Sequence, residues 1–185
     1  MKIEHHWQYM YRSMYFRGSV VMSAIAAIDI ALWDIKGKAL GAPVYELLGG
    51  RYRDKVRTYP AVFKFTPEDM AAACVELKAE GFTAARLMIT GDIRKDHAEY
   101  EDGIYSYRVA QHVARVKACR EAVGEDFDLI LEAHRSMLVP DAISFARQVE
   151  QYNPLFLEDP IAPDSNNVMA EVARKTTIPV ATGER

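Results

Sequence analysis

DLILE at residues 128–132, PLFLE at 154–158 and PVATGE at 179–184 are three apolar segments that each end in a glutamate. Consecutive glutamates are 26 residues apart, because 158 − 132 and 184 − 158 give the same difference. Each segment has the character of a short buried strand and is followed by turn or helix-start residues. Strands that alternate with helices at this spacing indicate a parallel sheet built from right-handed βαβ units.

The same alternation extends back along the chain to Arg51, where its character changes. We expect strands at 56–63, 83–89, 127–133, 155–157 and 178–182, and helices at 66–80, 104–123, 140–151 and 166–175. Before Arg51, apolar residues recur three or four positions apart from Met22 to Ala39, which predicts an amphipathic helix. A short helix at 43–48 follows, whereas residues 1–20 show no regular period. We therefore predict an α/β protein in which residues 51–185 form five βα units of a parallel sheet, as in β/α barrels and open α/β sheets.

The composition excludes several classes of function. Half of the residues are hydrophobic, 26% are charged and the net charge is −3, so nothing favours a nucleic-acid partner or an anionic membrane surface. No apolar run approaches the roughly 18 residues that a membrane span requires, and the charged, aromatic first twenty residues do not form a signal peptide. Cys74 and Cys119 lack metal-type spacing, so we expect reduced thiols in a cytoplasmic protein.

Glu132, Glu158 and Glu184 are expected at the C-terminal edge of the parallel sheet, where β/α barrels and open α/β sheets carry their active sites. Three carboxylates that converge there repel one another unless a cation neutralises them. Ligand sets made only of oxygen favour a hard cation, and Mg²⁺ is the best candidate. The alternative is that each glutamate caps a helix or forms an ion pair by itself, but the equal spacing favours one shared metal site.

Two further residues are candidates for chemistry near these glutamates. His134 follows Glu132 by two positions, so in an extended chain both side chains face the same side, and the imidazole can act as an acid or base. A structural role for His134 in the loop at 135–140 remains open. Arg86, late in the second strand, can bind a substrate carboxylate through two hydrogen bonds or form an ion pair with a ligand glutamate.

Four stretches resemble the mandelate racemase-like group of the enolase superfamily. MSAIAAIDIALWDIKGKALGAPVYELLGG (22–50) is similar to the helical end of that group's α+β capping domain. The resemblance implies that residues 1–50 are the C-terminal helical part of a capping domain and that residues 51–185 are the first five βα units of a partial TIM-like (β/α) barrel. Three further stretches resemble the group's metal-ligand strands, namely LEAHRSMLVP (131–140), FLEDPIAP (156–163) and PVATGER (179–185). The first of them carries Glu132 where an Asp is more usual. The resemblance implies abstraction of the proton α to a carboxylate, with Mg²⁺ stabilising the enediolate that forms.

Within this group the sequence is most similar to the acid-sugar dehydratases, in which a His placed like His134 helps to expel the β-hydroxyl. Racemases and cycloisomerases usually carry Lys-x-Lys where this chain has Arg86-Leu87-Met88, and methionine cannot accept a proton. Mannonate-type dehydratases use an Arg on the second strand with a Tyr in the following loop, for which Arg86 and Tyr100 are the candidates. Galactonate-type dehydratases use a His on the seventh strand. Which sugar acid is the substrate is not encoded in a recognisable pattern.

The resemblance also sets expectations for the chain as a unit. Relative to the family, the strands that begin the capping domain and everything after the third ligand are missing, so we expect little or no turnover by this chain alone. The exposed edge and apolar face of a five-stranded sheet favour a homo-oligomer. The expected partner is a small sugar acid. The alternatives are a non-catalytic enolase-like domain that serves assembly or regulation, and another enzyme of the group.

Overall fold

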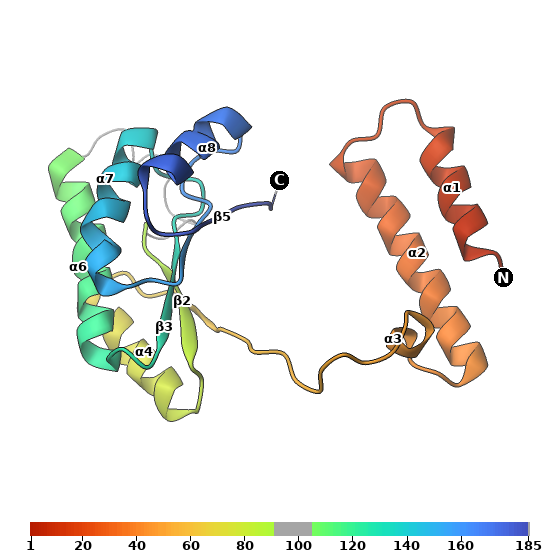
Figure 1. Ribbon diagram of the computed structural model, residues 1–185, viewed down its shortest axis with the longest axis horizontal. Coiled ribbons are helices and arrows are strands. Elements are labelled where there is room, and N and C mark those ends of the chain that lie inside the picture. Colours follow the sequence, from red (N-terminus) through yellow and green to blue (C-terminus); the bar gives the residue numbers. More distant parts are fainter. Residues whose placement is uncertain (91–104, 185) are drawn as a thin grey trace. The chain divides into compact units, whose positions relative to one another are not determined.

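The computed structural model describes residues 1–90 and 105–184 of the chain. These residues form two compact units, Met1–Val56 and Arg57–Glu184, which are described separately below (Figure 1). Tyr100, one of the candidate site residues, lies outside the described residues. Within the described ranges, no helix is both long enough and apolar enough to cross a membrane.

The first unit begins with a helix that the sequence pattern did not predict, α1 (Ile3–Ser13). Ile3, Trp7, Met10 and Tyr11 recur three or four positions apart on its buried or half-buried side, and contacts between side chains four residues apart add to its stability. The rings of Trp7 and Tyr11 stack with their centroids 4.8 Å apart, and Gln8 donates a hydrogen bond of 2.8 Å to Glu4. The prediction missed this helix because its stripe consists largely of Trp, Met and Tyr, and the exposed His5, His6 and Tyr9 obscure its period.

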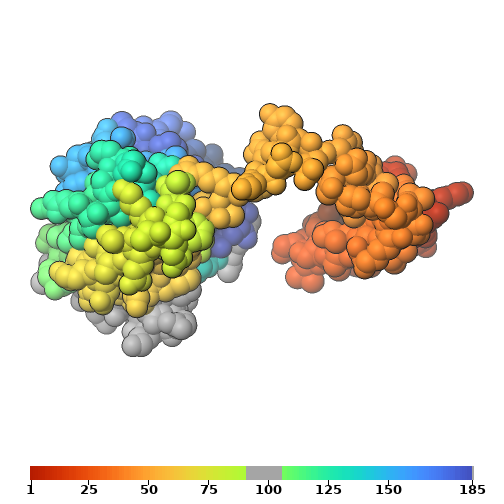
Figure 2. All heavy atoms as spheres, turned by 90° about the horizontal axis from the view of Figure 1, so that it is seen from below, coloured from red at the N-terminus to blue at the C-terminus, as the bar shows by residue number. Residues whose placement is uncertain are grey.

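The helix predicted from Met22 is confirmed as α2 (Ser19–Leu40), which is followed by the short α3 (Val44–Leu47). Of the predicted apolar stripe, Ile25 is buried, whereas Ile28 and Ile35 are 47% and 54% exposed. Within this unit α1 is the one long helix that packs on α2, so much of the apolar surface of α2 remains open. Figure 2 draws the atoms of this unit in red and orange.

The second unit is a sheet of five parallel strands whose order in space is their order in the sequence. The strands are β1 (Ala61–Val62), β2 (Ala84–Met88), β3 (Asp128–Glu132), β4 (Phe156–Glu158) and β5 (Val180–Ala181). The connecting helices are α4 (Pro67–Ala79), α6 (Tyr105–Val123), α7 (Val139–Val149) with the 3-10 turn η1 (Glu150–Tyr152), and α8 (Asn166–Lys175). The predicted fold class is confirmed: an α/β unit with a parallel five-stranded sheet follows the N-terminal helices.

The largest difference from the predicted elements concerns the first strand, which was expected at 56–63. Only two residues pair with β2, because Pro60 has no N–H to donate and Val56 is 72% exposed. The carbonyl of Pro60 still accepts a hydrogen bond of 2.9 Å from the backbone N–H of Arg86. The remaining strands and helices agree with the predictions to within a few residues, and α8 matches its predicted range.

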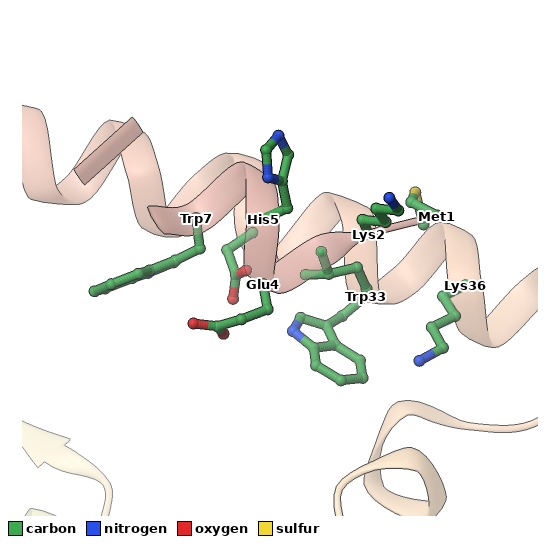
Figure 3. A pocket seen from close by; sticks show the side chains of 9 residues that line it. Met1, Lys2, Glu4, His5, Trp7, Trp33 and Lys36 are labelled. Carbon is green, nitrogen blue, oxygen red and sulfur yellow. The ribbon is translucent and has the colours of Figure 1, made fainter. Parts of the chain in front are cut away.

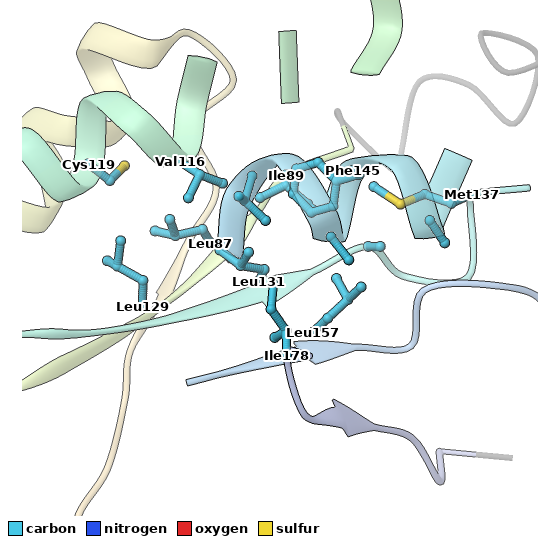
Figure 4. Packing of buried hydrophobic residues seen from close by; sticks show 14 of the residues in the cluster. Leu87, Ile89, Val116, Cys119, Leu129, Leu131, Met137, Phe145, Leu157 and Ile178 are labelled. Atoms are coloured by element: carbon cyan, nitrogen blue, oxygen red, sulfur yellow. The ribbon is translucent and has the colours of Figure 1, made fainter. Parts of the chain in front are cut away.

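The apolar core lies between the sheet and its helices (Figure 4). Leu87, Leu129, Leu131 and Leu157 are fully buried on this side and contact residues of α6 and α7 such as Val116 and Phe145. The two cysteines are free and buried, as predicted. Successive side chains of a strand point to opposite faces, so the residues that alternate with these leucines lie on the other face of the sheet. That face carries the candidate site.

Candidate metal centre

Glu132 and Glu158 lie side by side at the C-terminal ends of neighbouring strands. The register pairs Glu132 of β3 with Glu158 of β4, and Met88 of β2 with Glu132. The three side chains therefore form one row across the face of the sheet opposite the core. The row is largely enclosed, because Glu132 is 3% exposed and the side chain of Glu158 is 21% exposed. Two carboxylates in so small a space require compensation by positive charge.

Arg86 supplies this positive charge in the structure. Its Nη1 atom is 3.3 Å from Oε2 of Glu132 and 3.6 Å from Oε1 of Glu158. Arg86 precedes Met88 by two residues on β2, so its side chain leaves the same face of the sheet as the row of carboxylates. Of the two roles considered for Arg86, the structure contains the ion pair with candidate ligands.

The charges of the two glutamates are only partly compensated. Burial raises the pKa of Glu132 to about 7, although a backbone hydrogen bond from His134 (2.6 Å) and the positive charge of Arg86 oppose this effect. The nearby carboxylates of Glu158 and Asp159 raise it further. Oε2 of Glu158 is buried and has no hydrogen-bond partner among the described residues. A buried oxygen without a donor and a carboxylate that resists ionisation both fit a position where a cation binds.

Glu184 lies apart from the other two glutamates. The register pairs Glu158 with Ala181, so Glu184 is three residues beyond the row. Partners along the sheet are separated by 26 residues from β3 to β4 but by 23 from β4 to β5, because 158 − 132 is 26 and 181 − 158 is 23. Equal spacing in the sequence therefore does not give equal positions on the sheet. Within the described part of the chain, no three Asp, Glu, His or Cys side chains are close enough to hold a metal ion.

Arg135 binds Glu184 and His134 together. Its Nε atom forms an ion pair with Oε1 of Glu184 at 2.9 Å, and its Nη2 atom is 2.9 Å from Nε2 of His134. The chain is not extended here, since φ is +48° at His134 and +64° at Arg135. The alternation argument that placed His134 on the side of Glu132 therefore does not apply. The imidazole is instead held by its neighbour in the sequence.

Asp159 fixes the end of β4 next to this cluster. It is 5% exposed, has φ of +38° and accepts a hydrogen bond of 2.7 Å from Oγ1 of Thr182. Its backbone carbonyl accepts a further bond of 2.6 Å from the N–H of Arg135. The sequence patterns did not identify Arg135 or Thr182 as members of this cluster. The one feature that could have indicated Arg135 is its position directly after His134, the candidate acid.

The donor atoms of the candidate ligands suit Mg²⁺, which prefers carboxylate oxygens. Glu132 and Glu158 fit such an ion as they stand, given the unpartnered oxygen and the raised pKa described above. Glu184 instead forms an ion pair with Arg135 and does not converge with the other two carboxylates among the described residues.

The helical unit contains a hollow between α1 and α2 (Figure 3). Trp7 and Trp33 line it together with charged side chains of both signs, namely Lys2, Glu4, Asp29 and Lys36. None of these charged side chains is buried. The hollow therefore lacks the enclosed, unpartnered polar group that distinguishes the glutamate row.

Replacing Arg86 with methionine is expected to destabilise the metal-free chain. Arg86→Met leaves two close carboxylates without their cation, so we expect a loss of about 1–3 kcal/mol in the free energy of unfolding at pH 8. Arg86→Lys keeps the charge and should lose less. Urea denaturation of both variants measures the effect. An Arg86→Met chain as stable as the unmodified one at pH 8 would show that Arg86 does not compensate the pair.

Two family models match the chain. Residues 1–49 match the N-terminal domain of the mandelate racemase/muconate lactonizing enzymes, and residues 69–185 match the enolase C-terminal domain-like family. The second match alone covers more than half of the 185 residues.

Similar proteins are known by sequence and by structure. The chain is 42% identical to the D-galactonate dehydratase of Ralstonia pickettii and 39% identical to that of Pectobacterium atrosepticum, over its whole length but 47% of theirs. It thus spans about half the length of these curated relatives. A member of the enolase superfamily from Salmonella Typhimurium superposes with a TM-score of 0.89 at 33% identity, covering 100% of this chain and 52% of that one.

The 3,6-anhydro-D-galactonate cycloisomerase from Zobellia galactanivorans superposes with a TM-score of 0.80 at 31% identity, over 100% of this chain and 49% of that chain. Its likeness extends over both units. The family models, the sequence relatives and the solved structures agree: this chain belongs to the mandelate racemase/muconate lactonizing enzyme group of the enolase superfamily.

Proposed function

We propose that the chain provides the metal-binding strands of an Mg²⁺-dependent acid-sugar dehydratase, a hydro-lyase. The reaction removes the proton α to the substrate carboxylate and then the β-hydroxyl as water, and the resulting enol becomes a 2-keto-3-deoxy sugar acid. The observation that carries this proposal is the enclosed pair Glu132 and Glu158, with its unpartnered oxygen, at the C-terminal edge of a parallel sheet. Glu184 is the proposed third ligand.

The chain's own residues take separate roles in this proposal. Arg86, already seated between two carboxylates, has the charge and the donors to orient the substrate carboxylate. His134 is the proposed acid that protonates the departing hydroxyl. Tyr100 with Arg86 is the proposed pair for the α-proton. Bound Mg²⁺ supplies positive charge to the substrate carboxylate, on which negative charge develops as the proton leaves.

The position of Met88 favours a dehydratase over a two-base racemase. Met88 stands in the same row as the two glutamates and is 4% exposed. A thioether cannot take up a proton, so no base is available at this point of β2. The relatives named D-galactonate dehydratase support the same choice, whereas the cycloisomerase from Zobellia galactanivorans keeps a second reaction class under consideration.

Binding of a sugar acid in the presence of Mg²⁺ tests the proposal. The purified chain is heated with and without Mg²⁺ in the presence of D-galactonate, D-gluconate or D-mannonate, with galactitol as a control that lacks the carboxylate. We expect one of the acids to raise the midpoint of thermal unfolding only when Mg²⁺ is present. The same acid should have no effect on Glu158→Gln, which lacks one proposed ligand.

Exchange of the α-hydrogen in D₂O, followed by proton NMR over a long incubation because little turnover is expected of this chain alone, separates catalysis from simple binding. Mg²⁺-dependent exchange with formation of a 2-keto product supports the dehydratase, whereas exchange that returns only the substrate or its epimer supports a racemase. A chain that binds Mg²⁺ but responds to none of the acids would instead be a non-catalytic domain. Binding of an acid that is independent of Mg²⁺ would contradict the proposed site.

A further inference from the structure

We propose that Arg135 is a positioning residue that holds Glu184 and His134 together in the metal-free chain and must release Glu184 when the metal binds. The inference rests on the proposed function, because it takes Glu184 as the third ligand. It adds a competitor for that ligand, which no comparison with known proteins supplies. Metal occupancy and the state of the candidate acid His134 then become coupled through one guanidinium group.

The guanidinium of Arg135 contacts two side chains at once, and this two-pronged arrangement is called the fork. Nε and Nη2 of the planar guanidinium reach Glu184 and His134 respectively, both at 2.9 Å. Such a group can bind two acceptors at once in a fixed geometry, which the ammonium group of a lysine cannot reproduce. The side chain of Arg135 is 22% exposed and that of Glu184 is 42% exposed, so water weakens the pair without removing it.

The backbone around Arg135 fixes the position of the fork. The N–H of Arg135 donates to the carbonyl of Asp159, and the N–H of Met137 donates to the carbonyl of Pro160 at 3.1 Å. The loop is closed on itself by a bond of 3.1 Å from the N–H of Ser136 to the carbonyl of Ala133. The guanidinium is therefore placed by the ends of β3 and β4 and does not follow Glu184 freely.

The contact with His134 determines which ring nitrogen carries the proton. A guanidinium donates hydrogen bonds and cannot accept them, so Nε2 of His134 must be the acceptor. The proton of the neutral ring then lies on Nδ1. While Arg135 occupies Nε2, that nitrogen cannot transfer a proton to a departing hydroxyl.

Glu184 cannot serve the metal and Arg135 equally. The other two glutamates are joined by Arg86, and among the described residues the three carboxylates do not converge. Recruitment of Glu184 to this pair removes the carboxylate from the fork. Arg135 therefore lowers the affinity of the metal-free chain for Mg²⁺, and metal binding changes the environment of Nε2 of His134.

A double-mutant cycle between Arg135 and Glu184 tests this competition. Mg²⁺ is titrated calorimetrically into the 185-residue chain and into Arg135→Met, Glu184→Gln and the double variant, each checked for folding by circular dichroism. We expect Arg135→Met to bind Mg²⁺ about two- to fivefold more tightly, as is typical for the loss of a partly exposed ion pair. Glu184→Gln should bind more weakly, and in its background Arg135→Met should have a smaller effect.

The cycle and a lysine variant separate competition from a general effect of charge. Any long-range repulsion between Arg135 and the metal persists in the Glu184→Gln background and so cancels in the cycle. Arg135→Lys keeps the charge but not the fork, so it should also bind Mg²⁺ more tightly. Arg174→Met removes an exposed positive charge from α8 and should leave the affinity unchanged.

A spectroscopic measurement follows His134 directly. In ¹⁵N-labelled chain, with the signal assigned through His134→Gln, Mg²⁺ should shift the Nε2 resonance of His134, and in Arg135→Met this shift should largely disappear. Arg135→Met that binds Mg²⁺ equally well or more weakly overturns the inference. A chain that binds no Mg²⁺ at all would instead overturn the proposed metal site, so the two failures are distinguishable.

Discussion

The affinity of the chain for Mg²⁺ is expected to rise about tenfold for each pH unit from 5 to 7 and to level off above pH 7. The cause is Glu132, whose pKa burial raises to about 7. Below that pH the carboxyl group carries a proton that the metal must displace. Above it the carboxylate is already ionised, so the competition disappears.

The same pKa makes the metal-free chain less stable at high pH. The folded-state pKa of Glu132 is about 7, above its ordinary value of 4.5, so the folded protein binds the proton more tightly than the unfolded one. This contribution to stability is fully present below pH 4.5 and is lost as the pH rises through 7. Its size is about 3 kcal/mol, because one pKa unit corresponds to about 1.4 kcal/mol.

The titration of His112 makes the folded chain more stable as the pH rises, which is opposite to the effect of Glu132 over part of this pH range. Burial, reinforced by the positive charge of Arg115, lowers its pKa from 6.5 to about 4. Its contribution to stability is present above pH 6.5 and is lost as the pH falls towards 4. Between about pH 4.5 and 6.5 the two effects offset each other, so the pH profile of the unmodified chain alone does not reveal either one.

Comparison with Glu132→Gln isolates the glutamate. A glutamine resembles the protonated acid, so the variant should equal the unmodified chain near pH 4.5 and exceed its stability by about 3 kcal/mol at pH 8. Urea denaturation at four pH values without metal measures this difference, and calorimetric titration of Mg²⁺ at the same values measures the affinity. Mg²⁺ binding by the unmodified chain that does not change between pH 5 and 7 would contradict the assignment of Glu132 as a ligand.

The elements that the sequence predicted well are those whose periodicity reflects burial. The strands predicted at 127–133 and 155–157 are short apolar runs and are observed as β3 (Asp128–Glu132) and β4 (Phe156–Glu158), and helix α8 matches its predicted range. In these cases the local pattern and the tertiary packing agree. Helix α1 was missed although it is amphipathic, because exposed aromatic residues and histidines lie between the members of its apolar stripe and obscure the period.

The site was predictable as a position on the sheet but not as a set of contacts. The period of 26 residues matches the register between β3 and β4, so Glu132 and Glu158 meet. The period of 26 residues does not match the register between β4 and β5, where paired residues are 23 apart. The register of neighbouring strands depends on the geometry of the connecting loops, which the spacing of residues does not encode. The positive φ angles of His134 and Arg135 were also unpredictable, because they are set by the loop geometry and neither residue type requires them.

Arg120 is a further residue that no sequence pattern distinguishes, and its replacement is expected to have the largest effect on stability. It lies in α6, near the exposed Lys117, but is only 6% exposed. Its guanidinium donates to the carbonyls of Tyr152 (2.9 Å), Phe127 (2.7 Å), Asn153 (3.3 Å) and Gly124. One side chain thus satisfies backbone carbonyls from the end of α6, the start of β3 and the segment before β4.

Arg120→Met should lower the free energy of unfolding by about 3–4 kcal/mol, because the buried carbonyl of Phe127 and three partly buried carbonyls lose their donor at once. Arg120→Lys keeps the charge but reaches fewer of the carbonyls, so its loss should be intermediate. Lys117→Met removes a charge from the same helix at an exposed position and should change stability by less than about 0.5 kcal/mol. Urea denaturation at pH 7.5 compares the three. Equal stabilities of Arg120→Met and Lys117→Met would mean that water replaces the guanidinium at these carbonyls.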